Sequence, residues 1–334
     1  MEGARRRVCW RVTLLRFGLV LLLLSGVARA HAQAGPPFLT DDPETPGNKH
    51  WEINFGFTGN RNPGAGAYEV PDFDINYGLG DRIQLKYELP IAIEETRPLP
   101  ATDGQPAQPE SIAVGLGESL MGVKWRFYEH HPGDPWFGRN PPESADEAAS
   151  GEERVVDFSV GTYPQLWLNN PTTSVGRGVV ATGPDFLLPL EMNGRIGPIR
   201  LDGEVGYHFG NHQVPQSWIR GLIVGHEFTD RTEAYAEIYD AQDANRIPAG
   251  FGVGQFATGL PKQRETTLGL GGRQALNKPK TLLLMLMGGR SFQTITAQNS
   301  QPSWIAYVGL QVLLGPKEPV EPQVEQTKPD LSKR

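Results

Sequence analysis

The chain has 334 residues, and its 31 basic and 38 acidic side chains give a net charge of −7. Its 40 glycines and 29 prolines, about a fifth of the chain, exclude a helical bundle, because these are the two weakest helix formers. One cysteine excludes a disulfide framework. The mean hydropathy of −0.38 is that of a soluble protein, an impression that the patterns below test.

A secretory signal peptide is predicted over residues 1–34. Arginines precede the apolar run 17–24, and the segment ends in Ala32-Gln33-Ala34. A basic start, a short apolar run and an A-x-A site are the parts of a signal peptide, while an N-terminal membrane anchor would need a longer run. Cleavage removes Cys9, one acid and six arginines. The mature chain then carries 25 bases and 37 acids, a net charge of −12, and no basic patch that would bind nucleic acid.

Alternation of apolar and polar residues runs through the chain after residue 50. In the clearest stretch, 82–89, isoleucine, leucine and tyrosine alternate with charged and polar residues. A period of two indicates a strand with one apolar face. This pattern predicts about 12 antiparallel strands, in a range of about 10–14, at 50–58, 73–79, 82–89, 121–127, 156–160, 179–190, 199–209, 217–228, 233–238, 264–275, 281–289 and 303–314. Segment 281–287 is apolar on both faces, which predicts an apolar inner face there.

Two all-β architectures fit this pattern. A soluble sandwich turns its polar faces to water, whereas a transmembrane barrel turns its apolar faces to lipid. Tight connections are expected at 78–81, 191–198, 229–231 and 276–280, and longer ones at 59–71, 90–114, 241–263 and 290–302. Short turns on one rim and long loops on the other favour the barrel, with 129–153 and 211–216 as exceptions. We predict an outer-membrane β-barrel over residues 50–315, with aromatic girdles that include Trp51, Trp125 and Trp304.

Three short motifs stand out in the first third of the mature chain. Residues 35–44 read GPPFLTDDPE; NYGL at 76–79 leads into QLKYELP at 84–90; GLGE at 115–118 leads to GVKWRF at 122–127. Together they resemble the outer-membrane transporter family named for the meta-pathway of phenol degradation. The resemblance extends from Gly35 to about Gly315. It implies an outer-membrane β-barrel that transports hydrophobic or aromatic compounds.

Charged residues of both signs gather on the polar strand faces. In a barrel these faces line the lumen, and the candidates are Arg82, Lys86, Glu88, Lys124, Arg126, Asp157, Arg200, Asp202, Glu204, Glu233 and Glu237. One interpretation is a charged constriction that filters solutes. The other is a lumen sealed by ion pairs and hydrogen bonds.

The two ends of the mature chain differ from the strands in composition. Residues 35–49, which we call the leader, contain four prolines that keep it from pairing as a strand. It is predicted to be a periplasmic leader or a plug that enters the barrel. Residues 316–334 are rich in proline, glutamate and lysine, which predicts a disordered periplasmic tail.

Signals for catalysis or metal binding are weak. His208 and Ser217 lie near each other in the sequence and would be the core of a barrel hydrolase acting on lipid. The acids of 41–44 lack the spacing of a calcium loop, and the histidines at 130–131 stand in a loop rich in proline and glycine. We therefore predict no enzyme, no catalytic residue, no metal and no cofactor.

The predicted function is an outer-membrane channel or transporter for passive passage of small hydrophobic or aromatic molecules. Its location is the bacterial outer membrane. Its predicted partners are outer-membrane lipid, a small-molecule solute and the barrel assembly machinery. Two alternatives remain at this point: an outer-membrane barrel enzyme acting on lipid, and a soluble secreted β-sandwich that binds a ligand.

Overall fold

The computed structural model describes residues 37–98, 107, 109–131, 156–210, 216–243, 264–296 and 299–316. The predicted signal peptide, the start of the leader and nearly all of the predicted tail lie outside these residues. The described residues form one antiparallel sheet of β1(Trp51–Arg61), β2(Ala65–Leu79), β3(Ile83–Thr96), β4(Ser111–Leu116), β5(Ser119–His130), β6(Val156–Thr162), β7(Gln165–Leu168), β8(Asp185–Ile196), β9(Ile199–Phe209), β10(Ser217–Thr229), β11(Thr232–Asp243), β12(Arg264–Ala275), β13(Leu282–Thr296) and β14(Asn299–Leu314). In this part of the chain, no helix is long and apolar enough to span a membrane.

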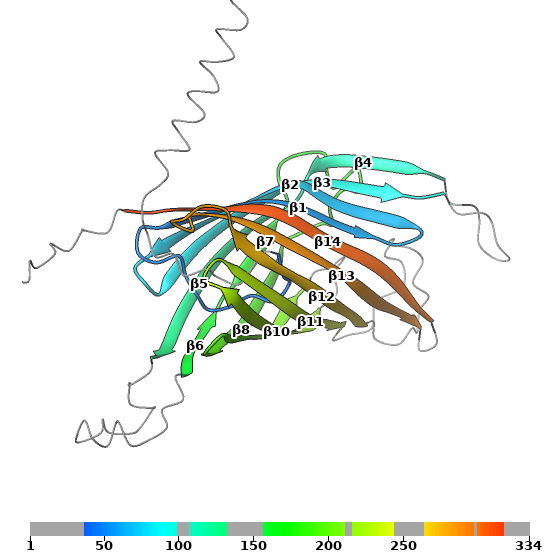
Figure 1. The fold of residues 1–334 in the computed structure, drawn as a ribbon. Helices are drawn as coiled ribbons and strands as arrows, with labels where there is room; N and C mark the ends of the chain where they lie inside the picture. The colour runs from blue at the N-terminus through cyan, green and yellow to red at the C-terminus, as the bar shows by residue number, and fades with distance from the viewer. Residues whose placement is uncertain are drawn as a thin grey trace, which may run out of the picture.

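The sheet closes on itself. β1 pairs with β14 along its whole length, from Trp51 opposite Leu314 to Arg61 opposite Trp304, and Figure 1 shows the two strands side by side. β4 and β5 both pair with β3 and form one wall strand interrupted at 117–118. β6 and β7 form another, interrupted at 163–164. The wall therefore has twelve strands, which confirms the predicted fold and strand number.

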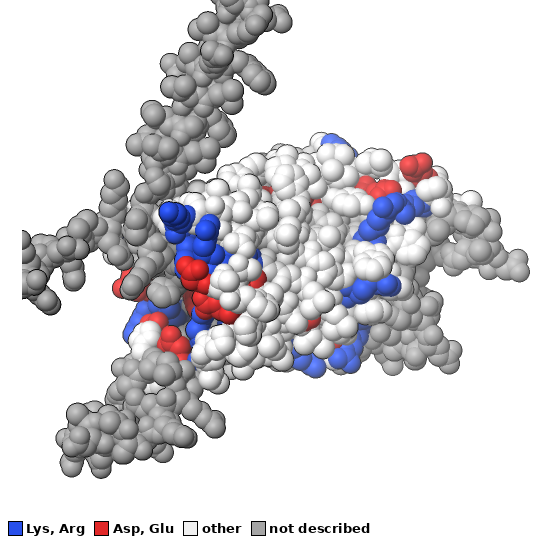
Figure 2. Space-filling model, in the orientation of Figure 1, with Lys and Arg blue, Asp and Glu red and all other residues white. Residues whose placement is uncertain are grey.

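The wall has apolar side chains on its outer face and polar side chains on its inner face, which is the reverse of a soluble sandwich. On β1, Trp51, Phe55 and Phe57 are exposed on the outside, whereas Glu52 and Asn54 are buried inside. Figure 2 shows charged side chains gathered toward the two ends of the barrel, with a broad, nearly uncharged band between them. Apolar residues that face outward in a closed ring belong against lipid. This arrangement rules out the soluble sandwich.

The ends of the wall strands define two rims. The terminal rim carries Trp51, Leu314 and the turns after β2, β8, β10 and β12, and the opposite rim carries the other connections. Three predicted connections and one predicted strand are corrected. Most of 59–71 and 290–302 belongs to β1, β2, β13 and β14, and β8 continues through most of 191–198. The predicted strand at 179–190 begins only at Asp185. The strands that run into the predicted connections continue beyond the part in which one face is apolar. The apolar–polar alternation therefore ends before the inter-strand hydrogen bonding does.

The longer connections mostly lie on the opposite rim. They join β3 to β4, β7 to β8 and β11 to β12. The connection from β5 to β6 is long and lies on the terminal rim, as the predicted exception at 129–153 required. Both termini of the barrel lie on the rim with the short turns, which is the arrangement of outer-membrane barrels.

Aromatic side chains lie on the outside near the strand ends. Trp51 packs on Tyr77 near the terminal rim, with ring centroids 4.6 Å apart. Near the opposite rim, Tyr207 packs on Trp218 at 4.9 Å. Trp304 is 63% exposed and lies under the Arg290 guanidinium at 4.3 Å. Amphipathic rings at both ends of the apolar band are typical of a membrane interface.

Candidate functional site

The predicted lumen residues occupy two kinds of position. Nine have buried or partly buried side chains on the inner strand faces: Lys86, Glu88, Lys124, Arg126, Arg200, Asp202, Glu204, Glu233 and Glu237. The other two lie at the terminal rim. Arg82 is exposed in the turn after β2, and Asp157 is half-exposed near the start of β6, where it contacts His131. These two lie at the rim because their strands begin there.

The leader enters the barrel from the terminal rim. At the rim, the Lys49 N–H donates to the Gly78 carbonyl at 2.8 Å, and the Thr45 hydroxyl donates to the Asp81 carbonyl at 2.8 Å. Further in, the Thr40 N–H donates to the Glu237 carboxylate on β11 at 2.7 Å. Leader residues 37, 38, 40, 42 and 43 are buried. The described part of the leader therefore passes through the lumen rather than along the outside.

Lys124 on β5 is the first of two basic residues that hold the leader. Its side chain is fully buried, and its ammonium lies 2.7 Å from the Asp41 carboxylate. It also donates to the Asp42 carbonyl and lies 3.9 Å from the Glu191 carboxylate on β8. The Tyr163 ring lies 4.9 Å from the ammonium. One cation thus links the leader to two parts of the wall.

Arg200 on β9 is the second basic residue. Its guanidinium pairs with Asp42 and Glu44 of the leader and with Asp202 of its own strand at 2.8 Å. Burial raises the pKa of the Asp42 carboxyl to about 8, although the positive charges of Arg200 and Lys124 act in the opposite direction. The sequence did not indicate which wall residues would meet the leader.

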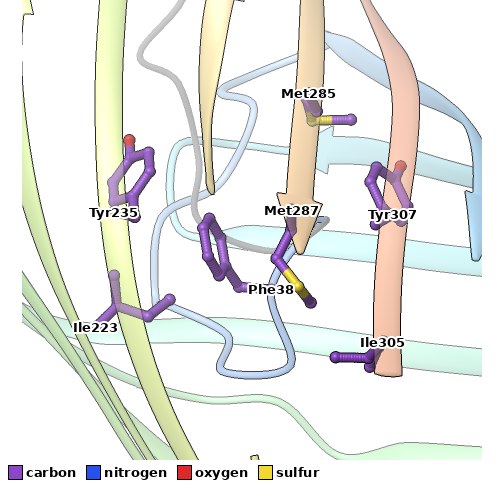
Figure 3. Close-up of a cluster of buried hydrophobic side chains, with 7 residues drawn as sticks. All are labelled: Phe38, Ile223, Tyr235, Met285, Met287, Ile305 and Tyr307. Atoms are coloured by element: carbon purple, nitrogen blue, oxygen red, sulfur yellow. The ribbon is translucent and has the colours of Figure 1, made fainter. Parts of the chain in front are cut away.

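The inner end of the leader lies on an apolar floor. Phe38 belongs to a buried cluster of residues from the middle of the wall, namely Ile223, Tyr235, Met285, Met287, Ile305 and Tyr307 (Figure 3). The Phe38 ring meets the Tyr235 ring edge-on at 5.4 Å. Met285 and Met287 are buried, as is Leu283, which confirms the apolar inner face predicted for 281–287. The leader therefore rests on both ion pairs and apolar contacts.

Tyrosine rings lie flat over glycines on the inner wall. A Cβ on Gly122 would lie 2.5 Å from the Tyr163 ring, and one on Gly225 would lie 2.6 Å from the Tyr235 ring. A Cβ on Gly56 would meet Tyr307 at 2.8 Å. These glycines are needed because the rings occupy the space of a side chain, so each ring stays close to the wall.

Two adjoining cavities lie inside the barrel beyond Phe38. The inner cavity has a volume of about 590 Å³, and Pro37, Phe38 and Leu39 of the leader are among its lining residues. The outer cavity, of about 440 Å³, extends toward the opposite rim, where Asn60 and Glu94 line it. Both are lined by Glu69, Glu88, Glu118, Leu120, Trp167 and Ile305. Volumes of this order accommodate a small organic molecule.

Several residues of this site were absent from the sequence prediction. Glu69, Asp72 and Glu118 line the cavities, and Glu191 contacts Lys124. Glu69 lies in segment 59–71, which the alternation predicts as a loop, and Asp72 lies just before the predicted strand at 73–79. In the structure β2 extends through both, with a register shift between the two acids. Glu191 was missed because it was placed in a turn. An extended alternation across Pro71 would have been the only available signal.

The predicted hydrolase residues come together only in part. His208 on β9 stands directly opposite Ser217 on β10, and its Nε2 lies 2.8 Å from the Asp185 carboxylate on β8. No hydrogen bond joins His208 to Ser217, both of which the structure describes. A serine nucleophile needs a base within hydrogen-bond reach. The constellation therefore lacks the contact that would activate it.

The possible metal-binding segments have other uses in the structure. Asp41, Asp42 and Glu44 pair with Lys124 and Arg200. Among the residues that the structure describes, no group of three histidine, cysteine or acidic side chains is arranged to hold a metal ion.

The glycines of 269–272 lie within β12, where a Cβ on Gly271 or Gly272 would collide with neighbouring backbone.

Comparison with solved structures identifies the class of fold. The COG4313 outer membrane channel from Pseudomonas putida F1 matches with a TM-score of 0.53 and 11% identity, over 84% of this chain and 100% of that one. The CymD monoaromatic hydrocarbon channel gives 0.37 and 7%, over 81% of this chain and 90% of that one. OpdL from Pseudomonas aeruginosa gives 0.35 and 9%, over 79% and 98%. The chain has the fold of an outer-membrane β-barrel.

The sequence comparisons add no family. No protein-family model matches the chain, and no curated protein matches it. The resemblance to the family named for the meta-pathway of phenol degradation therefore remains a prediction that rests on the three motifs described above.

Proposed function

We propose that this outer-membrane barrel is a channel for passive passage of small hydrophobic or aromatic molecules, and that the leader closes its lumen on the periplasmic side. The observation that carries the proposal is the pair of cavities beyond Phe38. They lie inside the wall, extend toward the opposite rim, and have aliphatic and aromatic lining residues such as Leu120 and Trp167.

The position of the leader supports a closed resting state. It is bound to the wall at Lys124, Arg200 and Glu237, and Phe38 packs into the apolar cluster at the bottom of the inner cavity. A solute that enters from the opposite rim meets this segment before it reaches the terminal rim. Passage then requires the leader to shift, so the channel has a closed and an open state.

A reversible crosslink can test whether the leader must move. A Cβ on Gly221 would lie 2.8 Å from the Thr40 Cβ, so the two positions are adjacent, and a small outward shift of the leader brings the pair to the spacing of about 3.5–4.5 Å found in disulfides. The predicted mature chain is free of cysteine, so Thr40→Cys with Gly221→Cys would form the only disulfide. We expect liposomes containing the oxidised protein to take up a toluene-sized aromatic solute no faster than protein-free liposomes, and reduction to raise the rate above that level.

Single Thr40→Cys protein is the matched control, because oxidation cannot lock its leader. Equal uptake by the oxidised and reduced double variant would show that solutes pass a stationary leader. Absence of uptake in every form, with the barrel folded, would contradict the channel itself. The same proposal includes contact with outer-membrane lipid, insertion by the barrel assembly machinery, membership of the phenol meta-pathway family and the absence of catalysis.

A further inference from the structure

Acidic side chains follow one side of the two cavities, along β2 and β3. Glu69, Glu88 and Glu94 line the outer cavity, as does Glu118 in the interruption between β4 and β5. None of the described residues that line the outer cavity is a lysine, arginine or histidine. The outer part of the path from the opposite rim to the leader is therefore lined by acidic side chains without a basic residue among those described.

The basic residues of the inner cavity already have partners. Lys86 lies 2.8 Å from the Glu88 carboxylate and 3.3 Å from that of Asp74, and His208 lies 2.8 Å from Asp185. These two are the bases among the described lining residues. Asp41 pairs with Lys124, and no ion pair joins the other lining acids, Glu69, Asp72, Glu118 and Glu204, to a cation among the described residues.

Asp72 is an unpartnered acid inside the inner cavity. It is 7% exposed, it lines the cavity, and its Oδ1 has no hydrogen-bond partner. The side chain of Glu69, its neighbour on β2, likewise forms no hydrogen bond or salt bridge with the described residues, and it lines the same cavity. Burying an unpaired carboxylate is unfavourable unless a cation or a donor meets it. The two acids therefore offer hydrogen-bond acceptors to a ligand in the cavity.

Tyr307 gives a second, independent indication of a polar ligand. Its side chain lines the same cavity and is 7% exposed, and its hydroxyl has no hydrogen-bond partner. Buried tyrosine hydroxyls usually have one. The ring is held against the wall over Gly56, so the hydroxyl cannot easily turn elsewhere.

The lining also includes large apolar side chains, which distinguishes the site from one for bare metal ions. Phe38, Leu39, Met287 and Ile305 line the inner cavity. Trp167 lines both cavities and offers a ring face on which a cation can rest. A ligand that has both an apolar body and a positive group therefore fits within this cavity.

From this juxtaposition we propose that the cavities bind small organic cations, in which a protonated amine is attached to an aromatic or aliphatic body. The inference rests on the proposed channel function and narrows its solute class. The ammonium pairs with Glu69 and Asp72, and the apolar body lies against Phe38 and Met287. Ammonium donors replace lost water contacts with charge-assisted hydrogen bonds to the carboxylates.

The test compares four probes on the purified full-length mature protein by calorimetry. Phenethylammonium carries both features, 2-phenylethanol lacks the charge, phenylacetate reverses it, and methylammonium lacks the apolar body. We expect phenethylammonium to bind about tenfold more tightly than each of the other three. In the double variant Glu69→Gln/Asp72→Asn, its affinity falls to that of 2-phenylethanol.

Glu52→Gln is the matched control, because Glu52 is a buried acid of the inner wall that lines neither cavity. It should keep the preference for phenethylammonium. Heat-modifiable migration on gels checks that each variant is folded, and Glu69→Gln alone replaces the double variant if that one does not fold.

Equal binding of phenethylammonium and 2-phenylethanol overturns the amine preference. Equal binding of methylammonium reduces the site to a simple charge and overturns it as well. Both results differ from a failure of the channel proposal, because uptake of 2-phenylethanol faster than into protein-free liposomes would still report an open conduit. A channel that takes up none of the probes would instead contradict the proposed function.

Discussion

Lys124 shows how a single residue ties the leader to the wall. Its ammonium lies between Asp41 of the leader and Glu191 of β8, and no water reaches its side chain, which is fully buried. Two negative groups on different segments share one positive charge. Because the interior screens charges poorly, the loss of this charge would leave both carboxylates without compensation.

We predict that Lys124→Met destabilises the protein by about 3–5 kcal/mol, the range for breaking one side of a buried ion pair. The measurement is the midpoint of urea unfolding in detergent, followed by heat-modifiable migration. Lys280→Met is the control, since Lys280 forms an exposed pair with Asp230 at 3.6 Å and such pairs contribute about 0–1 kcal/mol. Equal midpoints for the two variants would refute the anchoring role of Lys124.

The sequence pattern identified which charged residues point into the lumen, but it did not identify what they bind there. Lys124 and Arg200 were recognised as lumen candidates because they alternate with outward apolar residues. Their partners in the leader could not be recognised, because Asp42 and Arg200 are 158 residues apart. Alternation reports which way a side chain points, and it contains no information on what fills the space in front of it.

Among the elements, the wall strands are specified locally and the leader is not. The alternation predicts the twelve wall strands. It does not predict where a strand ends when polar residues occupy both faces, as in the outer parts of β1 and β2. Two wall strands are interrupted, at 117–118 and 163–164, and the second interruption places Tyr163 over Gly122. In each tyrosine and glycine pair, the glycine lets the inner aromatic ring lie close to the wall.

Gly122→Val tests this packing at the level of a strand. The new side chain would collide with the Tyr163 ring, so we expect a loss of about 1–3 kcal/mol, as for other overpacked sites. Gly288→Val on β13 is the control, because a Cβ there meets nothing within 4 Å. In a Tyr163→Ala background, Gly122→Val should cost less stability than it does in the wild-type protein. An equal loss in the two backgrounds would show that the collision is not the cause.

For the molecule as a whole, the polarity of the outer surface determines where the chain is stable. Leu222, near the middle of β10, is 46% exposed on the apolar band, and Phe228, near the terminal rim, is 65% exposed. The mean hydropathy of −0.38 could not reveal this band, because the lumen accounts for half of each strand. The lipid therefore stabilises a surface that water would not.

We expect Leu222→Arg to reduce stability in phospholipid bilayers by about 2–4 kcal/mol, the depth-dependent cost of arginine at the bilayer midplane. Phe228→Arg should cost about 0–1 kcal/mol, because an interfacial arginine stays hydrated. Reversible unfolding in liposomes of defined thickness measures both. Similar losses at the two positions would show that the membrane does not surround the barrel at this height.

Titratable side chains of the leader and of the wall lie together in one buried cluster, so closure of the channel should depend on pH. Asp42 is surrounded by Arg200 and Asp202 of β9, Lys124 of β5, Glu191 of β8, and Asp41 and Glu44 of the leader. Acids outnumber bases in this cluster. Insertion of the leader therefore brings negative charges together in a place from which water is largely excluded.

The direction of the effect follows from proton binding. Burial raises the pKa of Asp42 to about 8 in the inserted leader, against 3.8 for an ordinary aspartate. The inserted state binds a proton that a released leader does not, so this contribution to closure is fully present below about pH 4 and is lost as the pH rises through about 8. We predict that openings in planar bilayers become more frequent between pH 6 and pH 9. Asp42→Asn should abolish the dependence and Asp230→Asn, in an exposed turn, should retain it, whereas more frequent openings on acidification would contradict the argument.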